Sequence, residues 1–300
     1  MGRFGNGGIG MSARSVNQKI SSILIYSILI LVAVGTLFPF LYVIGVSLTT
    51  QSEVLRRGIV LIPEEITFAA YQTVFRSFGI EQAYQITLFR TIVGTFLNLL
   101  FTILPAYVLS KRAIPGRSGL LMFIIFTMLF SGGLIPTYIV IKSLGLINSV
   151  WSLIFPGLIS VFNLVVMKGF FEQLPAEIEE SAKVDGAGEL ITLWRIILPL
   201  ALPSIATIGL FYAVGHWNSY FDAIMYINNS DLMPLQVVLR NILLNAQFQA
   251  IDSGISQDQY VSTVAVQMAA VIISTLPILC VYPFIQKHFT KGVLMGAVKG

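Results

Sequence analysis

Apolar residues gather in six long runs separated by polar segments, and this alternation dominates the chain. A helix needs about 20 apolar residues to cross a hydrocarbon core roughly 30 Å thick, so each run predicts one membrane-spanning helix. The pattern therefore predicts an all-α membrane protein with six transmembrane helices. The expected spans cover about residues 20–48, 86–109, 119–141, 150–170, 200–227 and 263–285.

Prolines fall inside or at the edges of these runs. Membrane helices tolerate proline where neighbouring groups satisfy the carbonyls that it frees. We therefore expect kinked helices packed in a bundle. The prolines concerned are Pro39, Pro105, Pro136, Pro156, Pro203 and Pro277.

Composition supports a membrane location and excludes several kinds of site. Hydrophobic residues make up 56% and charged residues 11% of the 300 residues, whereas soluble domains carry about 25% charged residues. The net charge of +4 comes from scattered basic residues that form no stripe, which argues against a nucleic-acid partner. The single cysteine, Cys280, excludes an intrachain disulfide, and His216 and His288 are too few and too far apart for a metal site.

The distribution of Lys and Arg predicts the orientation in the membrane. With the N-terminus inside, 12 of the 18 Lys and Arg residues fall on cytoplasmic segments, and an excess of these residues marks the cytoplasmic side. The first run is too long for a cleavable signal peptide and no A-x-A-like site follows it. We expect a cytoplasmic N-terminal tail (residues 1–19), a six-helix domain (20–285) with a cytoplasmic loop at 172–199, and a cytoplasmic C-terminal tail (286–300).

The loop at residues 172–199 has its own helical pattern. Pro175 suits the first position of a helix, and the glutamates that follow it favour the positive end of the helix dipole. Gly186 and Gly188 then supply the freedom for a stop. We expect a helix of two to three turns, a glycine turn, and a break at Pro199 before the fifth span. A second, amphipathic helix between them is expected to run through Leu190, Leu193, Trp194 and Ile197.

Within this loop, the sequence ESAKVDG at residues 180–186 is followed, after a gap of nine residues, by IILP at 196–199. This pattern resembles the EAA motif of ABC importer permeases, and residues 172–199 are here called the EAA segment. Ser181 replaces the usual middle alanine, a mild change because serine is also small. In the family the motif docks a separate ATPase, so the resemblance implies coupling, whereas the alternative is an ordinary surface loop. The residues that the resemblance assigns to coupling are Glu177, Glu180, Ser181, Ala182, Asp185, Gly186, Ile196, Leu198 and Pro199.

The similarity to the family extends over residues 20–300. Residues 106–117 resemble the end of its second helix, and residues 131–138, 234–236 and 282–287 look like its carbohydrate-uptake branch, more narrowly the polysaccharide or lipoprotein-type permeases. The resemblance implies the type I importer permease fold, also called MetI-like. The tail is similar to that of the maltose-type subunit, which reaches into the ATPase dimer, and the residues concerned are Gly296, Ala297, Val298, Lys299 and Gly300.

The resemblance implies that this chain is not an enzyme and binds no cofactor. Its implied partners are a second homologous permease subunit, two ATPase subunits that hold ATP and Mg, an extracytoplasmic solute-binding protein, the oligosaccharide and membrane lipid. The sequence itself has no G-x-x-x-x-G-K-[ST] phosphate loop. A G-x-G-x-x-G match at residues 5–10 lacks the preceding strand that a dinucleotide site requires.

Polar and aromatic residues in the spans are candidates for a translocation path, because ionisable groups in a membrane are costly and usually functional. Arg90, four residues into its expected span and so roughly 6 Å below the outer end, has a second interpretation as a structural pair with Asp222. Aromatic faces bind sugars, although Trp and Tyr also anchor helices at the interface. The candidates are Arg90, Asn98, Asn163, Tyr212, Trp217, Asn218, Tyr220 and Asp222, and His216 belongs to the same polar set.

These observations favour a permease subunit that imports an oligosaccharide by alternating access between two packed states. The loops at residues 49–84 and 228–262 are, by the resemblance, contact surfaces for the binding protein, or else simple connections. An importer of a non-sugar solute is the nearest alternative, because the motif does not contact cargo. An ion-coupled secondary transporter would need buried carboxylates or broken helices at the membrane midplane. An intramembrane enzyme would need a nucleophile and base, or a metal cluster, which the sequence lacks.

Overall fold

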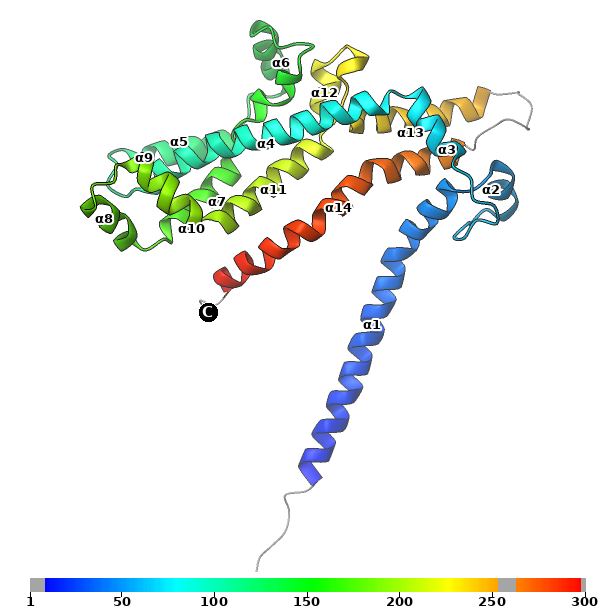
Figure 1. Ribbon diagram of the computed structural model, residues 1–300, viewed down its shortest axis with the longest axis horizontal. Helices are drawn as coiled ribbons and strands as arrows, with labels where there is room; N and C mark the ends of the chain where they lie inside the picture. The colour runs from blue at the N-terminus through cyan, green and yellow to red at the C-terminus, as the bar shows by residue number, and fades with distance from the viewer. Residues whose placement is uncertain (1–8, 253–262, 298–300) are drawn as a thin grey trace, which may run out of the picture. The chain divides into compact units, whose positions relative to one another are not determined.

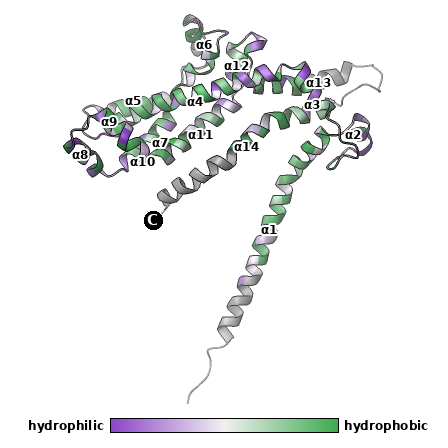
Figure 2. Cartoon of the chain, in the orientation of Figure 1, coloured by the Kyte–Doolittle hydropathy of each residue, from purple (hydrophilic) through white to green (hydrophobic). Residues whose placement is uncertain are grey.

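Helices make up most of the part of the chain that the structure describes. The computed structural model describes residues 9–252 and 263–297 and contains no strand in them (Figure 1). It divides into two compact units, residues 1–73 with 253–272 and residues 74–252 with 273–300. Apolar residues predominate along the coloured parts of the long helices (Figure 2). The prediction of an all-α chain is therefore confirmed.

The first unit contains the longest helix. Helix α1 (Ile9–Ser47) includes an apolar stretch, Ser21–Ser47, that is long enough to cross a membrane. It begins well inside the segment expected as an N-terminal tail. Helix α2 (Gln51–Arg57) follows after three residues, and helix α3 (Ala69–Ser77) begins in this unit.

The second unit is built around α4 (Ile80–Ser110). This helix packs against α7 (Val161–Glu172) and α11 (Leu202–Asn218), and its buried face is small or polar at many positions. Where the three helices and the EAA segment meet, they enclose a core of mostly apolar side chains. The core residues are Ala106, Tyr107, Met167, Phe171, Leu193, Ile197, Ala201, Ile208 and Tyr212.

Three of the six expected spans are broken rather than continuous. The third is divided between α5 (Arg117–Leu129) and α6 (Leu134–Ser143), which are bent by 108°. Gly133 lies in this break at φ +90°, which glycine tolerates because it has no Cβ. The fourth consists of two 3-10 turns, η1 (Val150–Leu153) and η2 (Phe155–Gly157), followed by α7 with a bend of 51°. Six spans are present if each bent pair counts as one.

The fifth and sixth spans also differ from the expected ranges. The fifth ends at Asn218 rather than near residue 227, and a short helix α12 (Phe221–Tyr226) follows. A 3-10 turn η4 (Ser230–Leu232) then leads to α13 (Leu235–Asp252). The last helix, α14 (Thr263–Ala297), continues twelve residues past the expected end at 285, through most of the segment expected as a tail.

Candidate functional site

The EAA segment has the expected helix, glycine turn and second helix. Helix α8 (Ala176–Val184) begins after Pro175, which is its cap rather than its first residue. The helix ends in a Schellman motif, in which the Ala187 N–H donates to Ala182 O at 2.9 Å and the Gly186 N–H donates to Lys183 O at 3.0 Å. Gly186 has φ +80°, a conformation that strains any residue with a Cβ. The glycine turn is therefore confirmed as a conformational requirement.

The residues assigned to coupling lie mainly on the outer surface of the EAA segment. Ala182 is buried, and the Ser181 hydroxyl donates to Glu177 O at 2.7 Å, so the serine in place of alanine leaves no unpaired group. Val184, which the sequence analysis did not single out, is 88% exposed beside the turn. Glu177, Glu180, Asp185, Gly186 and Pro199 are also exposed, and Ile196 and Leu198 are half-buried.

The second helix is less amphipathic than expected. It consists of α9 (Glu189–Thr192), a π-helical turn η3 (Leu193–Ile197) and α10 (Leu198–Leu200). Leu193 and Ile197 are buried as expected, whereas Leu190 and Trp194 are exposed. Leu190, Trp194 and Val184 are therefore exposed apolar side chains on the surface of the segment.

The break expected at Pro199 was misplaced. Pro199 lies in the first turn of α10, where its missing N–H is not needed. The chain changes direction two residues later, at Ala201, and the helices on either side are bent by 83°.

An ion-pair network ties the EAA segment to the end of α4. Lys111, directly after α4, pairs with Glu179 of α8, and its ammonium group lies 4.0 Å from the Tyr107 ring centroid. The Tyr107 hydroxyl donates to Glu189 Oε2 at 3.1 Å, and Glu189 also pairs with Lys183 at 3.0 Å. The hydrogen bond to Glu189 raises the pKa of Lys183. The network joins α4, α8 and α9, so α4 and the EAA segment are mechanically linked.

A second network fixes the start of the EAA segment. Glu172, the last residue of α7, pairs with Arg117 at the start of α5 and with Lys168 at 2.8 Å. Arg117 Nε also donates to Leu109 O at 2.6 Å. The ends of α4, α5 and α7 are therefore tied together where the segment begins. Sequence analysis counted Lys111, Arg117 and Lys168 as markers of orientation and missed these contacts.

A cavity of about 490 Å³ with a mixed polar and apolar lining lies between α4, α11, α12 and the broken fourth span. It brings together four of the predicted path residues, Arg90, Asn163, Tyr212 and Asp222, with His216. Asn163 is nearly buried at the start of α7, behind the break in the fourth span. The other predicted residues, Asn98, Trp217, Asn218 and Tyr220, are not in the lining of this cavity.

Arg90 is a structural centre of this unit. It lies ten residues into α4, about 15 Å from the helix start rather than the expected 6 Å, and is 1% exposed. It forms the expected ion pair with Asp222 and donates to Ser219 O and Leu153 O, each at 3.2 Å. Asp222 also accepts from the Ser219 hydroxyl at 2.8 Å. The guanidinium thus joins α4 to η1 and to the turn between α11 and α12.

Asn98 holds the break in the fourth span. Its amide nitrogen donates to Gly157 O and Leu158 O, both at 2.8 Å, and its oxygen lies 2.7 Å from His216 Nε2. Because the two carbonyls fix the orientation of the amide, the oxygen accepts and His216 Nε2 is the donor. The ring reaches Asn98 past Gly94, where a Cβ would lie 2.8 Å from His216 Cε1.

The aromatic candidates have different roles. The Tyr212 hydroxyl accepts from Ser160 N at 3.0 Å and bonds Thr102 Oγ1 at 2.7 Å, so it also supports the break in the fourth span. Trp217 is buried and donates from Nε1 to Ser274 O at 3.2 Å. Tyr220 is exposed, and Asn218 Nδ2 donates to Val214 O within its own helix.

Two further expectations concern the tail and metal chemistry. Gly296 and Ala297 lie in the last turn of α14, whereas Val298, Lys299 and Gly300 lie outside the described residues. Within the described ranges, no group of three or more His, Cys, Asp or Glu residues is arranged to hold a metal ion.

Known proteins resemble this chain over nearly its whole length. Residues 8–295 match the family described as binding-protein-dependent transport system inner membrane component. Protein LplC of Bacillus subtilis (strain 168) is 48% identical over 276 residues, which cover 91% of this chain and 94% of that protein. The polygalacturonan/rhamnogalacturonan transport system permease protein YtcP of the same organism is 43% identical over 286 residues, covering 95% of this chain and 100% of that protein.

A solved structure supports the fold independently. The crystal structure of a bacterial ABC transporter involved in the import of the acidic polysaccharide alginate contains a chain that matches with a TM-score of 0.82. The two chains are 32% identical, and the match covers 91% of this chain and 98% of that chain. The fold expected from the resemblance is therefore confirmed.

Proposed function

The chain belongs to the family of binding-protein-dependent transport system inner membrane components, and from this premise we propose that it is one permease subunit of an ATP-driven oligosaccharide importer. The cargo is supported by these similarities, since one relative is named for polygalacturonan and rhamnogalacturonan transport and the similar solved structure is of a transporter involved in the import of alginate. An importer for a non-sugar solute is the alternative, because the EAA segment does not contact cargo.

The proposed assembly follows from membership of the family. In it, two separate ATPase subunits bind ATP and Mg, in keeping with a sequence that contains no phosphate loop. A second homologous permease subunit and an extracytoplasmic solute-binding protein complete the complex. The chain crosses the cytoplasmic membrane several times with both termini and the EAA segment in the cytoplasm, because Lys and Arg are in excess on those segments.

The EAA segment is the proposed point of coupling to the ATPases. Its exposed apolar residue Val184 and the small residues around Gly186 give a docking subunit a close approach. Movement of α8 is passed to α4 through Lys111 and Glu179. Because α4 also carries Arg90 and lines the cavity, the same helix connects ATPase closure to the cargo path.

The observation that carries this proposal is the turn at Gly186. This glycine has φ +80°, and a Cβ added to it would face open space. A β-branched residue at that φ costs on the order of 1–3 kcal/mol and distorts the turn. Gly186→Val is therefore expected to insert and assemble normally but to lose binding-protein stimulation of ATP hydrolysis. The complex reconstituted in proteoliposomes, with stimulated and basal ATPase rates measured, provides the test.

Two matched variants separate backbone strain from side-chain bulk. Gly188 also faces open space but has an ordinary φ of −72°, so Gly188→Val is expected to keep the stimulation. Gly186→Asn is expected to keep most of it, because asparagine tolerates the left-handed region. Normal stimulation in a fully assembled Gly186→Val complex would refute the coupling role of the turn.

A further inference from the structure

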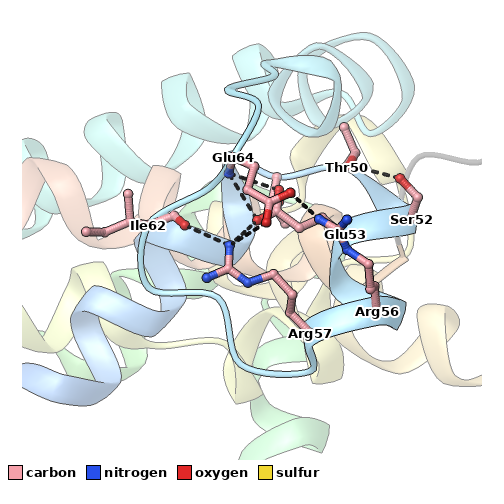
Figure 3. A network of polar contacts seen from close by, with 8 residues as sticks. Thr50, Ser52, Glu53, Arg56, Arg57, Ile62 and Glu64 are labelled. Carbon is pink, nitrogen blue, oxygen red and sulfur yellow. Dashed lines mark hydrogen bonds and ion pairs between the residues drawn. The ribbon is translucent and has the colours of Figure 1, made fainter.

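A buried carboxylate organises the loop that follows α1. Glu53 of α2 accepts hydrogen bonds from Thr49 Oγ1 at 2.7 Å, from Arg57 at 2.7 Å and from the Glu64 backbone N–H at 3.0 and 3.1 Å (Figure 3). The hydrogen bond from Thr49 is the largest of the effects that lower the pKa of Glu53. Arg57 also donates to Ile62 O at 3.3 Å. These contacts close residues 53–64 into one fixed loop.

The closed loop folds back along the side of α1. A Cβ added to Gly45 would lie 2.7 Å from Leu61 O and closer still to Val60 O, so only glycine permits this approach. Val60 is fully buried. Gly45 is two residues inside the end of the apolar stretch of α1 at Ser47, or about 3 Å at 1.5 Å per residue. The loop backbone is therefore level with the end of the membrane span rather than beyond it.

The side chains around Val60 point outward and are apolar. Ile59 is 62% exposed, Ile62 is 79% exposed, and Leu61 is also exposed. On α1, Leu41 and Ile44 are exposed just inside the same end of the span. An exposed apolar patch of this kind marks a contact with protein or membrane. Because it continues the apolar surface of a membrane-spanning helix, lipid is the occupant that its position favours.

We propose that residues 59–62 form an interfacial anchor, in which Ile59, Leu61 and Ile62 insert into the lipid at the boundary between headgroups and acyl chains. Apolar side chains at this depth gain by leaving water, as in helices that lie in the membrane interface. The Glu53 contacts hold the loop in the shape that presents these side chains. The anchor removes residues 59–62 from the surface that a binding protein would contact and does not depend on the cargo.

Depth-dependent quenching tests the anchor in the assembled transporter in nanodiscs. In a Cys280→Ser background, Ile62→Cys is labelled with an environment-sensitive fluorophore. We expect a doxyl-labelled phospholipid to remove most of the emission and iodide in the buffer to leave it unchanged. Glu65→Cys is the matched control, because Glu65 is a polar, exposed residue directly after the loop. At that position iodide should remove most of the emission and the doxyl-labelled phospholipid should leave it unchanged.

Two results would overturn the proposal. Quenching by iodide alone would place Ile62 in water, and protection from both quenchers would show that a protein, either the partner permease or the binding protein, covers it. Retained ATP-driven transport by the unlabelled variant shows that the substitution is tolerated. If Ile62→Cys does not assemble, Ile59→Cys provides the same measurement at a second exposed position of the loop.

Discussion

At the scale of single residues, the polar groups predicted to line a cargo path are largely occupied in holding the unit together. Arg90 bonds to Leu153 O, Ser219 O and Asp222. Asn98 and Tyr212 also form hydrogen bonds with backbone groups at the break in the fourth span. Where a membrane helix is broken, groups on neighbouring helices must satisfy the freed backbone groups, and these residues do so.

The Arg90 and Asp222 pair is expected to be structural. Arg90→Gln leaves a partly buried carboxylate without its partner, which should lower the free energy of unfolding by about 3 kcal/mol for any cargo. Adding Asp222→Asn should recover much of that loss because the uncompensated charge is removed. Thermal unfolding is measured on the purified complex with both single variants and with the double variant. This double-mutant cycle gives the coupling free energy between positions 90 and 222.

An exposed arginine provides the control for this cycle. Arg240→Gln on α13 should change stability little, since Arg240 is exposed. Absence of coupling between positions 90 and 222 would contradict the structural role. Normal assembly of Arg90→Gln with selective loss of anionic oligosaccharide transport would instead assign Arg90 to cargo recognition.

At the scale of elements, α4 connects the EAA segment to the cavity. Lys111→Met removes the ion pair with Glu179 and the contact with the Tyr107 ring, while leaving the core of α4 intact. We expect the complex to assemble and to hydrolyse ATP, but to transport roughly fivefold less sugar per ATP, a coupling loss of about 1 kcal/mol. Uptake and hydrolysis measured in the same proteoliposomes give this ratio.

The neighbouring residue allows a matched comparison for this prediction. Arg112 is exposed one position further along, so Arg112→Met removes a positive charge without touching α8 and should leave the ratio unchanged. Lys111→Arg should restore most of the coupling. An unchanged ratio in Lys111→Met would mean that α8 acts on the bundle through other contacts.

At the scale of the whole molecule, broken helices do not by themselves identify the mechanism. The sequence analysis named broken spans as a mark of secondary transporters, and three such spans are present here. Family membership decides between the mechanisms, because the match covers residues 8–295. The bent spans are therefore features of an importer permease rather than signs of ion coupling.

Removal of the tail tests the assembly as a whole. Deleting residues 293–300 should leave membrane insertion intact, because the deleted residues are few and lie beyond the expected last span, but should impair binding-protein-stimulated ATP hydrolysis. Insertion and complex formation are followed by co-purification, and stimulation by the ATPase rate. In an otherwise intact chain, Val298→Cys should crosslink to an ATPase subunit, and failure to do so in every nucleotide state would exclude the contact.

The sequence by itself determined the features that local physics controls. The lengths of the apolar runs predicted the spans. A chain that crosses lipid must form its backbone hydrogen bonds internally, so an apolar run of that length becomes a helix. The turn at Gly186 was also predictable, since a glycine directly after a helix-forming stretch commonly ends the helix, and Gly186 has the positive φ of such an end. The start of the helix after Pro175 followed from the same local rules to within one residue.

Only the tertiary structure decided where the spans break and which polar groups meet. Prolines located the bends only in part. Pro136, Pro156 and Pro203 lie beside the three breaks, whereas Pro39 and Pro105 lie inside continuous helices. Pro199 fits within a first helical turn, and the chain turns at Ala201 instead. Asn98 reaches carbonyls 59 and 60 residues away, and Arg90 reaches a carboxylate 132 residues away. No local pattern encodes such partners, because they depend on how closely α4 packs against its neighbours, as at Gly94 beside His216.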